Sequence, residues 1–110
     1  MIRVDAVWLA VHPLDMRLGT EAALARVVAI FGAAHPNHAY LFANKRANRM
    51  KVLVHDGMGV WLAARRLNAG KFVWPQDGAS TLSLTRTQLD ALVLGLPWQH
   101  LPELSLITRA

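Results

Sequence analysis

The spacing of apolar residues predicts a strand and then a helix in the first third of the chain. Residues 7–11 form a continuous apolar run that ends at His12-Pro13, where proline cannot continue a hydrogen-bonded ladder, so we expect a buried strand. Four apolar residues then recur at the spacing of one helix face: Leu24, Val27, Val28 and Phe31. Gly32 follows them and is the residue type that commonly ends a helix.

The middle of the chain alternates with a period of two, which predicts antiparallel strands. Residues 39–43 and 49–55 are two such runs, and the polar residues between them predict a hairpin. The Asp-Gly turn at 56–57 leads into a further strand over residues 60–64. We also expect a short strand over residues 71–74, closed by a proline.

The last third predicts an edge strand and a second helix. Residues 81–84 alternate, and Thr85 with Gln88 matches a helix capping box. Apolar residues at helical spacing follow, and Pro97 ends the helix: Leu89, Leu92, Val93 and Leu96. The order of elements predicts an α+β fold, a small antiparallel meander sheet with two helices packed on one face. The 110 residues suit a single domain over 1–110.

Composition narrows the class of protein. With 54% hydrophobic residues, the chain can build a core, and no run reaches the roughly 20 apolar residues of a membrane span. The N-terminus lacks the pattern of a secretory signal, so we expect a cytoplasmic protein without membrane contact. The sequence contains no cysteine, which leaves neither a disulfide nor a thiolate ligand for zinc.

The positive charge is concentrated in the middle of the chain. The segment from Lys45 to Lys71 contains seven basic residues and one acid, Asp56, whereas the rest of the chain is net −1. A local excess of this kind favours a polyanionic partner, because binding releases counterions from the phosphates. The alternative is that these bases only solubilise the exposed face of a sheet.

The hairpin over residues 44–51 is the best candidate for a DNA-contacting element. A two-stranded ribbon can enter a major groove or follow a phosphate backbone. Lys45 and Arg46 would lie at its tip, and Arg49 and Lys51 would share the face opposite the one that Met50 occupies. Consecutive strand residues point to opposite faces, so at most one of Arg65 and Arg66 extends this surface. The candidate residues are Lys45, Arg46, Arg49, Lys51, Arg65, Arg66, Lys71 and Arg17.

Catalytic and metal-binding motifs are weak. Asp15 and Asp56 are the acids from which a metal-dependent nuclease would be built, but helix capping and turn chemistry account for both. The five histidines include no pair at helical i, i+4 spacing. We therefore expect no enzyme activity, no metal and no cofactor. Packing in the core is the expected role of the four tryptophans, with base stacking as the alternative.

Several blocks of the sequence together resemble one family over about residues 7–98. They are Asp15-Met16-Arg17 with Gly19, Tyr40-Leu41-Phe42, the run from Asn44 to Leu53, Asp56-Gly57, Trp61, Arg66-Leu67 and the run from Gly70 to Pro75. These blocks are similar to the accessory protein TnpB of insertion-sequence-66-type transposons, which is unrelated to the RNA-guided nuclease of that name. His55 and the residues ahead of Asp15 depart from the family pattern.

The resemblance implies a helper in transposition, because strand transfer in such elements is attributed to a separate transposase. It supplies no catalytic residue. Two functions are compatible with it: binding to DNA at the element ends or the target, and recruitment of the transposase or other proteins of the element. The apolar tail over residues 101–107 is a candidate surface for the second. Self-association into a homo-oligomer stays open.

Overall fold

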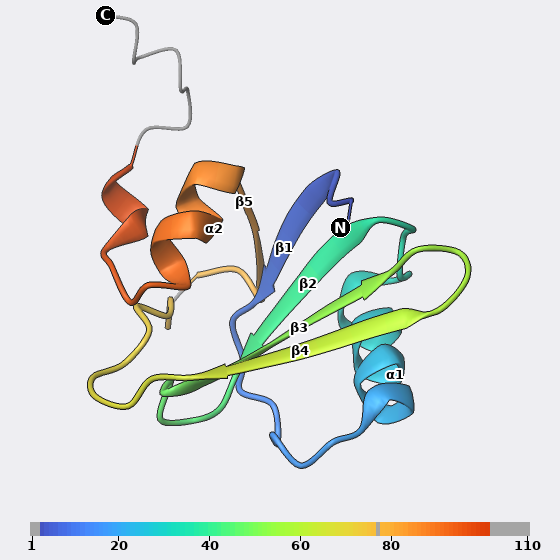
Figure 1. The fold of residues 1–110 in the computed structure, drawn as a ribbon, viewed down its shortest axis with the longest axis horizontal. Helices are drawn as coiled ribbons and strands as arrows, with labels where there is room; N and C mark the ends of the chain where they lie inside the picture. Colours follow the sequence, from blue (N-terminus) through green and yellow to red (C-terminus); the bar gives the residue numbers. More distant parts are fainter. Residues whose placement is uncertain (1–2, 77, 102–110) are drawn as a thin grey trace, which may run out of the picture.

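The computed structural model describes residues 3–76 and 78–101. Within these residues the chain forms one sheet and three helical segments (Figure 1). The elements are β1 (Ala6–Ala10), α1 (Thr20–Phe31), β2 (His38–Ala43), β3 (Arg49–His55), β4 (Val60–Arg66), β5 (Thr81–Leu84), α2 (Arg86–Leu92) and the 3₁₀ helix η1 (Trp98–His100).

The five strands lie in the order β4-β3-β2-β1-β5. Three of the four strand pairs are antiparallel, which confirms the α+β class and the expected hairpin over β2 and β3. The pair β1–β2 is parallel, with Leu9 beside Leu41, so the sheet is mixed and is not a pure meander. The reason is that a helical crossover, α1, connects these strands, whereas a tight turn would have made them antiparallel.

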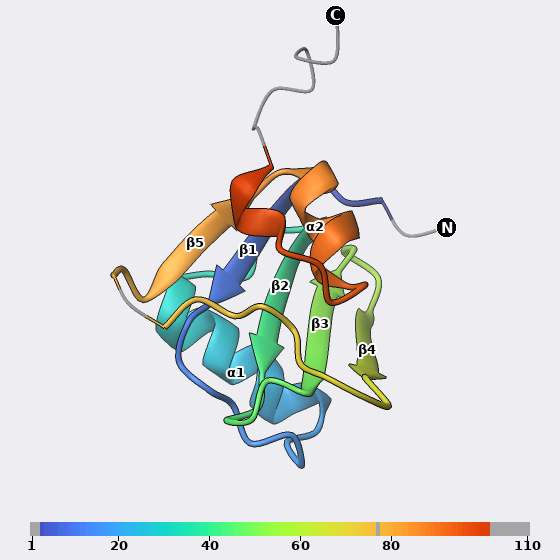
Figure 2. The same ribbon diagram turned by 90° about the vertical axis from the view of Figure 1, so that its left-hand side faces the viewer.

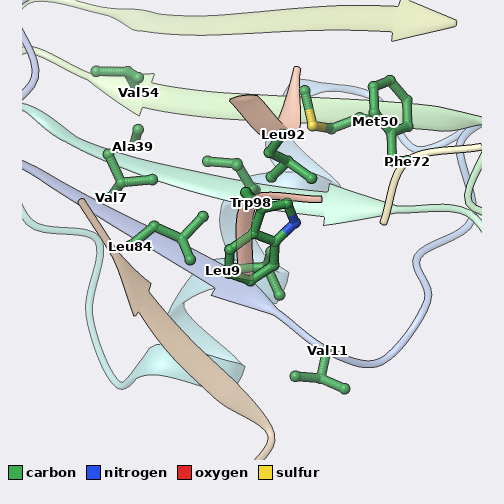
Figure 3. Packing of buried hydrophobic residues seen from close by; sticks show 11 residues of the cluster. Val7, Leu9, Val11, Ala39, Met50, Val54, Phe72, Leu84, Leu92 and Trp98 are labelled. Carbon is green, nitrogen blue, oxygen red and sulfur yellow. The ribbon is translucent and has the colours of Figure 1, made fainter. Parts of the chain in front are cut away.

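The helices cover opposite faces of the sheet, and the expectation that both would share one face was wrong. Leu9 faces a cluster that contains Leu92 and Trp98 from the α2 side (Figure 3). Its neighbour Ala10 belongs to a second cluster, which contains Val27 from α1. In Figure 2, α2 lies in front of the sheet and α1 behind it. The uninterrupted apolar run at residues 7–11 fits this arrangement, because strands buried on both faces do not alternate.

The expected strand over residues 71–74 was also wrong, since residues 71–76 have no regular structure. Side chains and single backbone contacts hold this segment on the sheet instead. The Phe72 amide donates to the carbonyl of Ala47 at 2.7 Å, and the Trp74 indole donates to the carbonyl of Ala10 at 3.0 Å. The first of these bonds satisfies a backbone amide that a strand would have satisfied in a ladder, and the second anchors the segment through a side chain.

The helix ends follow their sequence signals. Gly32 ends α1 in a left-handed conformation with φ of 87°, which an L side chain adopts only with strain. Thr85 and Gln88 form the predicted capping box at the start of α2. That helix ends at Leu92, one turn earlier than expected, so Leu94 and Leu96 are 62% and 49% exposed.

Replacing Leu53 by alanine should lower the free energy of unfolding by about 2–5 kcal/mol, because the side chain is fully buried beneath α1 and its removal leaves a cavity. Urea denaturation followed by circular dichroism measures this change. Leu94→Ala is the matched control, since Leu94 is 62% exposed, and should cost about 0.5 kcal/mol or less. Equal losses for the two variants would contradict the placement of Leu53 in the core.

Candidate nucleic-acid interface

The turn between β2 and β3 is built around the carboxamide of Asn44. Its Oδ1 accepts hydrogen bonds from the backbone amides of Asn48 and Arg49 at 3.1 and 3.0 Å. Its Nδ2 donates to Oδ1 of Asn48 at 2.7 Å. Ala47 takes a left-handed conformation with φ of 59°, which closes the turn. The two asparagines therefore shape the turn that presents Lys45 and Arg46, and both polar atoms of the Asn44 side chain form hydrogen bonds within the turn.

Basic residues from two separate segments meet at this turn. Lys45, Arg46 and Arg49 line one hollow together with Arg17 from the loop between β1 and α1. The other lining residues are Pro13, Leu14, Asp15, Met16 and Asn44. All four basic side chains are exposed. The hollow thus brings together bases that lie about thirty positions apart in the sequence.

A neighbouring hollow extends the positive surface along the sheet. Arg49 also lines this second hollow, with Lys51 from β3 and Arg66 from β4. Arg49 stands directly opposite Arg66 in the β3–β4 register, so the two side chains share the α1 face with Lys51. We call the whole set the basic end: Arg17, Lys45, Arg46, Arg49, Lys51 and Arg66. In Figure 1 it lies where the β2–β3 turn meets the end of β4, away from the β3–β4 turn.

The six side chains of the basic end differ in burial and in the contacts they already make within the protein. Lys51 is half-buried, and its ammonium donates to the carbonyl of Leu18 at 2.9 Å. This contact ties the start of α1 to β3, a role that no signal in the sequence indicated. Lys45, Arg46 and Arg49 are exposed and stand around a fixed turn. They are the side chains best placed to meet a ligand.

Two of the eight candidate bases are not part of the basic end, although one of them, Arg65, also contributes to the lining of the second hollow. Arg65 stands opposite Met50, on the α2 face, and its Nε donates to the carbonyl of Val93 at 2.6 Å. The side chains of Arg65 and Arg66 therefore point to opposite faces of the sheet, as expected for neighbouring residues of a strand. Lys71 is exposed and follows the turn after β4, beside the segment that crosses the α2 face.

Asp15 is the acidic residue that lines the first hollow beside bases of the basic end. Its carboxylate accepts two hydrogen bonds from the guanidinium of Arg17, at 3.1 and 2.9 Å, and one from the Arg17 amide at 2.9 Å. These bonds, the side-chain ones foremost, lower the pKa of Asp15 from 3.8 to about 2, and the charge of Lys51 adds to the shift. The sequence suggested that Asp15 caps a helix, whereas the structure uses it to orient Arg17, whose side chain remains 90% exposed.

Asp56 lies at the far end of β3, in the β3–β4 turn. Its Oδ1 accepts from the amides of Met58 and Gly59, and its Oδ2 accepts from the indole of Trp61 at 3.2 Å. The backbone bonds, and then the indole, lower the pKa of Asp56. The turn explanation for this aspartate is confirmed. Asp15 and Asp56 stand at opposite ends of β3, so the two carboxylates do not share one ion.

The part of the chain that the structure describes contains no group of three or more histidine or acidic side chains arranged to hold a metal ion. The tryptophans mostly pack as expected: Trp98 is buried, and Trp8 and Trp74 are half-buried. Trp61 is the exception, with 52% of its surface exposed on the edge strand.

Replacing Arg17 by alanine should raise the pKa of Asp15 from about 2 part of the way towards 3.8, because the variant lacks the side-chain bonds and charge of Arg17 while the backbone amide remains. A depressed carboxyl pKa stabilises the fold above the unfolded value and loses that effect as the pH falls towards 2. The variant should therefore lose less stability between pH 4 and pH 2, relative to its own value at neutral pH.

Carbon-13 NMR of the Asp15 carboxyl measures the titration. Arg3→Ala is the matched control, because Arg3 pairs with Asp5 in an equivalent exposed contact. It should leave the midpoint of Asp15 unchanged. An Asp15 midpoint that is the same in the wild type and in Arg17→Ala would contradict the ion pair.

None of the helices within residues 3–76 and 78–101 has the length and apolar composition required to cross a bilayer.

Comparison with known proteins connects this fold to transposition. The family model described as "IS66 Orf2 like protein" matches residues 5–103. Two proteins of Sinorhizobium fredii, both described only as uncharacterized, are similar along most of their length. The protein y4hO is 31% identical over 96 residues, which cover 86% of this chain and 83% of y4hO. The protein y4jC is 29% identical over 93 residues, which cover 84% and 80%.

No solved structure matches the chain. The family match includes the Asp15–Arg17 loop, the β2–β3 hairpin and the end of β4, so it covers the whole basic end. The family consists of accessory proteins and is not a known enzyme family. The resemblance drawn from the sequence is thereby confirmed, and the chain belongs to the IS66 Orf2-like family, the transposition-associated accessory proteins known as TnpB of IS66 elements.

Proposed function

We propose that this chain is a single-domain, non-catalytic accessory protein of IS66-type transposition that binds DNA through its basic end. The observation that carries the proposal is the convergence of bases from three segments of the chain around Arg49, which lines both hollows. A cluster of exposed arginines and lysines on a rigid turn matches the spaced negative charges of a phosphate backbone. The protein would act in the cytoplasm and would need no cofactor.

Contact with phosphates is a better fit than readout of bases. Asn44 has the side chain suited to an adenine edge, but its polar atoms are engaged within the turn, and the exposed side chains there are bases that can neutralise phosphates. Phosphate contacts fix the position of a protein on a duplex without reading its sequence. We therefore infer that this chain holds DNA at an element end or target, and that the choice of DNA belongs to the transposase it assists.

Recruitment of another protein of the element is the second candidate function. Leu94 and Leu96 are the observation that favours it, because both are exposed apolar side chains just after α2. The apolar tail to which we assigned this role from the sequence runs from Leu101 to Ile107, and residues 102–110 lie outside the described part of the chain. The two functions use separate surfaces, so they are separable by mutation.

Removing the three exposed bases of the turn should weaken DNA binding and its dependence on salt. In Lys45/Arg46/Arg49→Ala, the slope of log affinity against log salt concentration should fall by about 0.9 for each phosphate that the variant no longer neutralises. Fluorescence anisotropy with a labelled duplex of the element's terminal repeat, titrated at several salt concentrations, measures both quantities. A scrambled duplex of equal length should bind similarly, because phosphate contacts carry no sequence information.

The matched control is Arg3/Arg26/Arg86→Ala, which removes the same charge from exposed positions outside the basic end. It should keep most of the wild-type affinity. If both triple variants lose affinity equally, net charge and not the basic end governs binding. If the folded wild-type protein does not bind DNA even at low salt, the DNA proposal fails and transposase recruitment becomes the favoured function.

A further inference from the structure

The strand β4 forms one edge of the sheet (Figure 2), and six of its seven residues are exposed. Among its residues only Leu62 is half-buried, while Trp61 is 52% and Val60 36% exposed. Residues 60–64 carry no charge and no proline. The edge strands of β-sheets are normally protected by charges, prolines or bulges, because an unprotected edge strand can pair with a strand of another molecule. The apolar part of β4 has none of these protections.

The backbone groups that face outward can be assigned from the hydrogen bonds at the two ends of the β3–β4 ladder. The Leu67 amide donates to the carbonyl of Asn48, and the Asp56 amide donates to the carbonyl of Gly59. In an antiparallel ladder, bonded and non-bonded pairs alternate. Trp61, Ala63 and Arg65 therefore direct their backbone groups towards β3. The outward groups belong to Val60, Leu62, Ala64 and Arg66.

The distribution of charge along β4 fits a second copy of the same strand in the antiparallel direction. Asp56 precedes the strand, and Arg65 and Arg66 end it. Parallel pairing of two copies would place the arginines side by side, which is unfavourable. Antiparallel pairing places each arginine pair against the other copy's Trp61 end, where the carboxylate of Asp56 is bound to the indole.

The register follows from the outward groups and the length of the strand. Full overlap of residues 60–66 centres the pair on Ala63, so that Leu62 meets Ala64 of the second copy and both contribute outward groups. Trp61 then lies opposite Arg65 of the second copy on the α2 face. The Arg65 contact with Val93 uses Nε, and a guanidinium has two further nitrogens that can donate to Asp56 or cover the indole.

We propose that the protein forms a two-fold symmetric homodimer by antiparallel pairing of β4 with β4 of a second copy, centred on Ala63, to give a continuous ten-stranded sheet. The contact is self-complementary, as a two-fold interface requires. It accounts for the exposed Trp61 and for Arg65, neither of which belongs to the basic end. It makes no use of DNA, so it stands or fails independently of the DNA proposal.

Sedimentation equilibrium over a range of concentrations tests the dimer with the full chain. The wild type should approach twice the 12.2 kDa mass of the chain. Ala63→Lys places two like charges face to face and should weaken self-association by about tenfold or more. Ala63→Asp should do the same. Ala29→Lys is the matched control, since it adds an equal charge at an exposed position of α1 and should leave the dimer intact.

An equimolar mixture of Ala63→Lys and Ala63→Asp should restore the dimer, because only the proposed register places these two side chains opposite each other. Circular dichroism confirms that each variant is folded. A wild type that stays monomeric at its highest soluble concentration would overturn the proposal. So would a dimer that persists in Ala63→Lys, or a mixture of the two variants that remains monomeric.

Discussion

Burial of the central strands on both faces is the constraint on which the rest of this structure depends. β1 and β2 pair in parallel at the centre of the sheet, with α1 on one side and α2 with η1 on the other. No described polar or charged side chain is fully buried. Because both faces are occupied at the centre, charged residues are confined to the ends and edges of the sheet, where loops and strand termini bring them together.

This confinement explains how a modest net charge becomes a local site. Because β1 and β2 are parallel and β2 and β3 are antiparallel, the loop between β1 and α1 lies at the end of the sheet where β3 begins. Lys51 fixes that loop by donating to the carbonyl of Leu18. Arg17 is thereby held beside the β2–β3 turn, with Asp15 setting its orientation. Fold stability and the placement of the bases thus depend on the same contacts. An accessory protein that binds the phosphate backbone of DNA requires basic side chains held in fixed positions and does not require reactive groups.

The sequence predicted most elements and the hairpin correctly because local signals determine them: Gly32, the Thr85 capping box and the alternation of β3. It missed the side of the sheet that each helix covers, although the uninterrupted apolar run at residues 7–11 is a signal of burial on both faces. It also mistook residues 71–74 for a strand, because the tryptophan contacts that hold this segment join residues far apart in the chain. Strand alternation correctly predicted that at most one of Arg65 and Arg66 extends the basic surface, and the β3–β4 register shows that it is Arg66.

The central claim is that the basic end is the surface that meets DNA, and NMR of the isotope-labelled protein tests it most directly. A short duplex is added at low salt, and the backbone amide shifts are followed residue by residue. The account predicts changes concentrated at residues 15–18, 44–51 and 66, which diminish as salt is added. Changes concentrated on α2 and residues 94–96, or no changes at any amide, would contradict it.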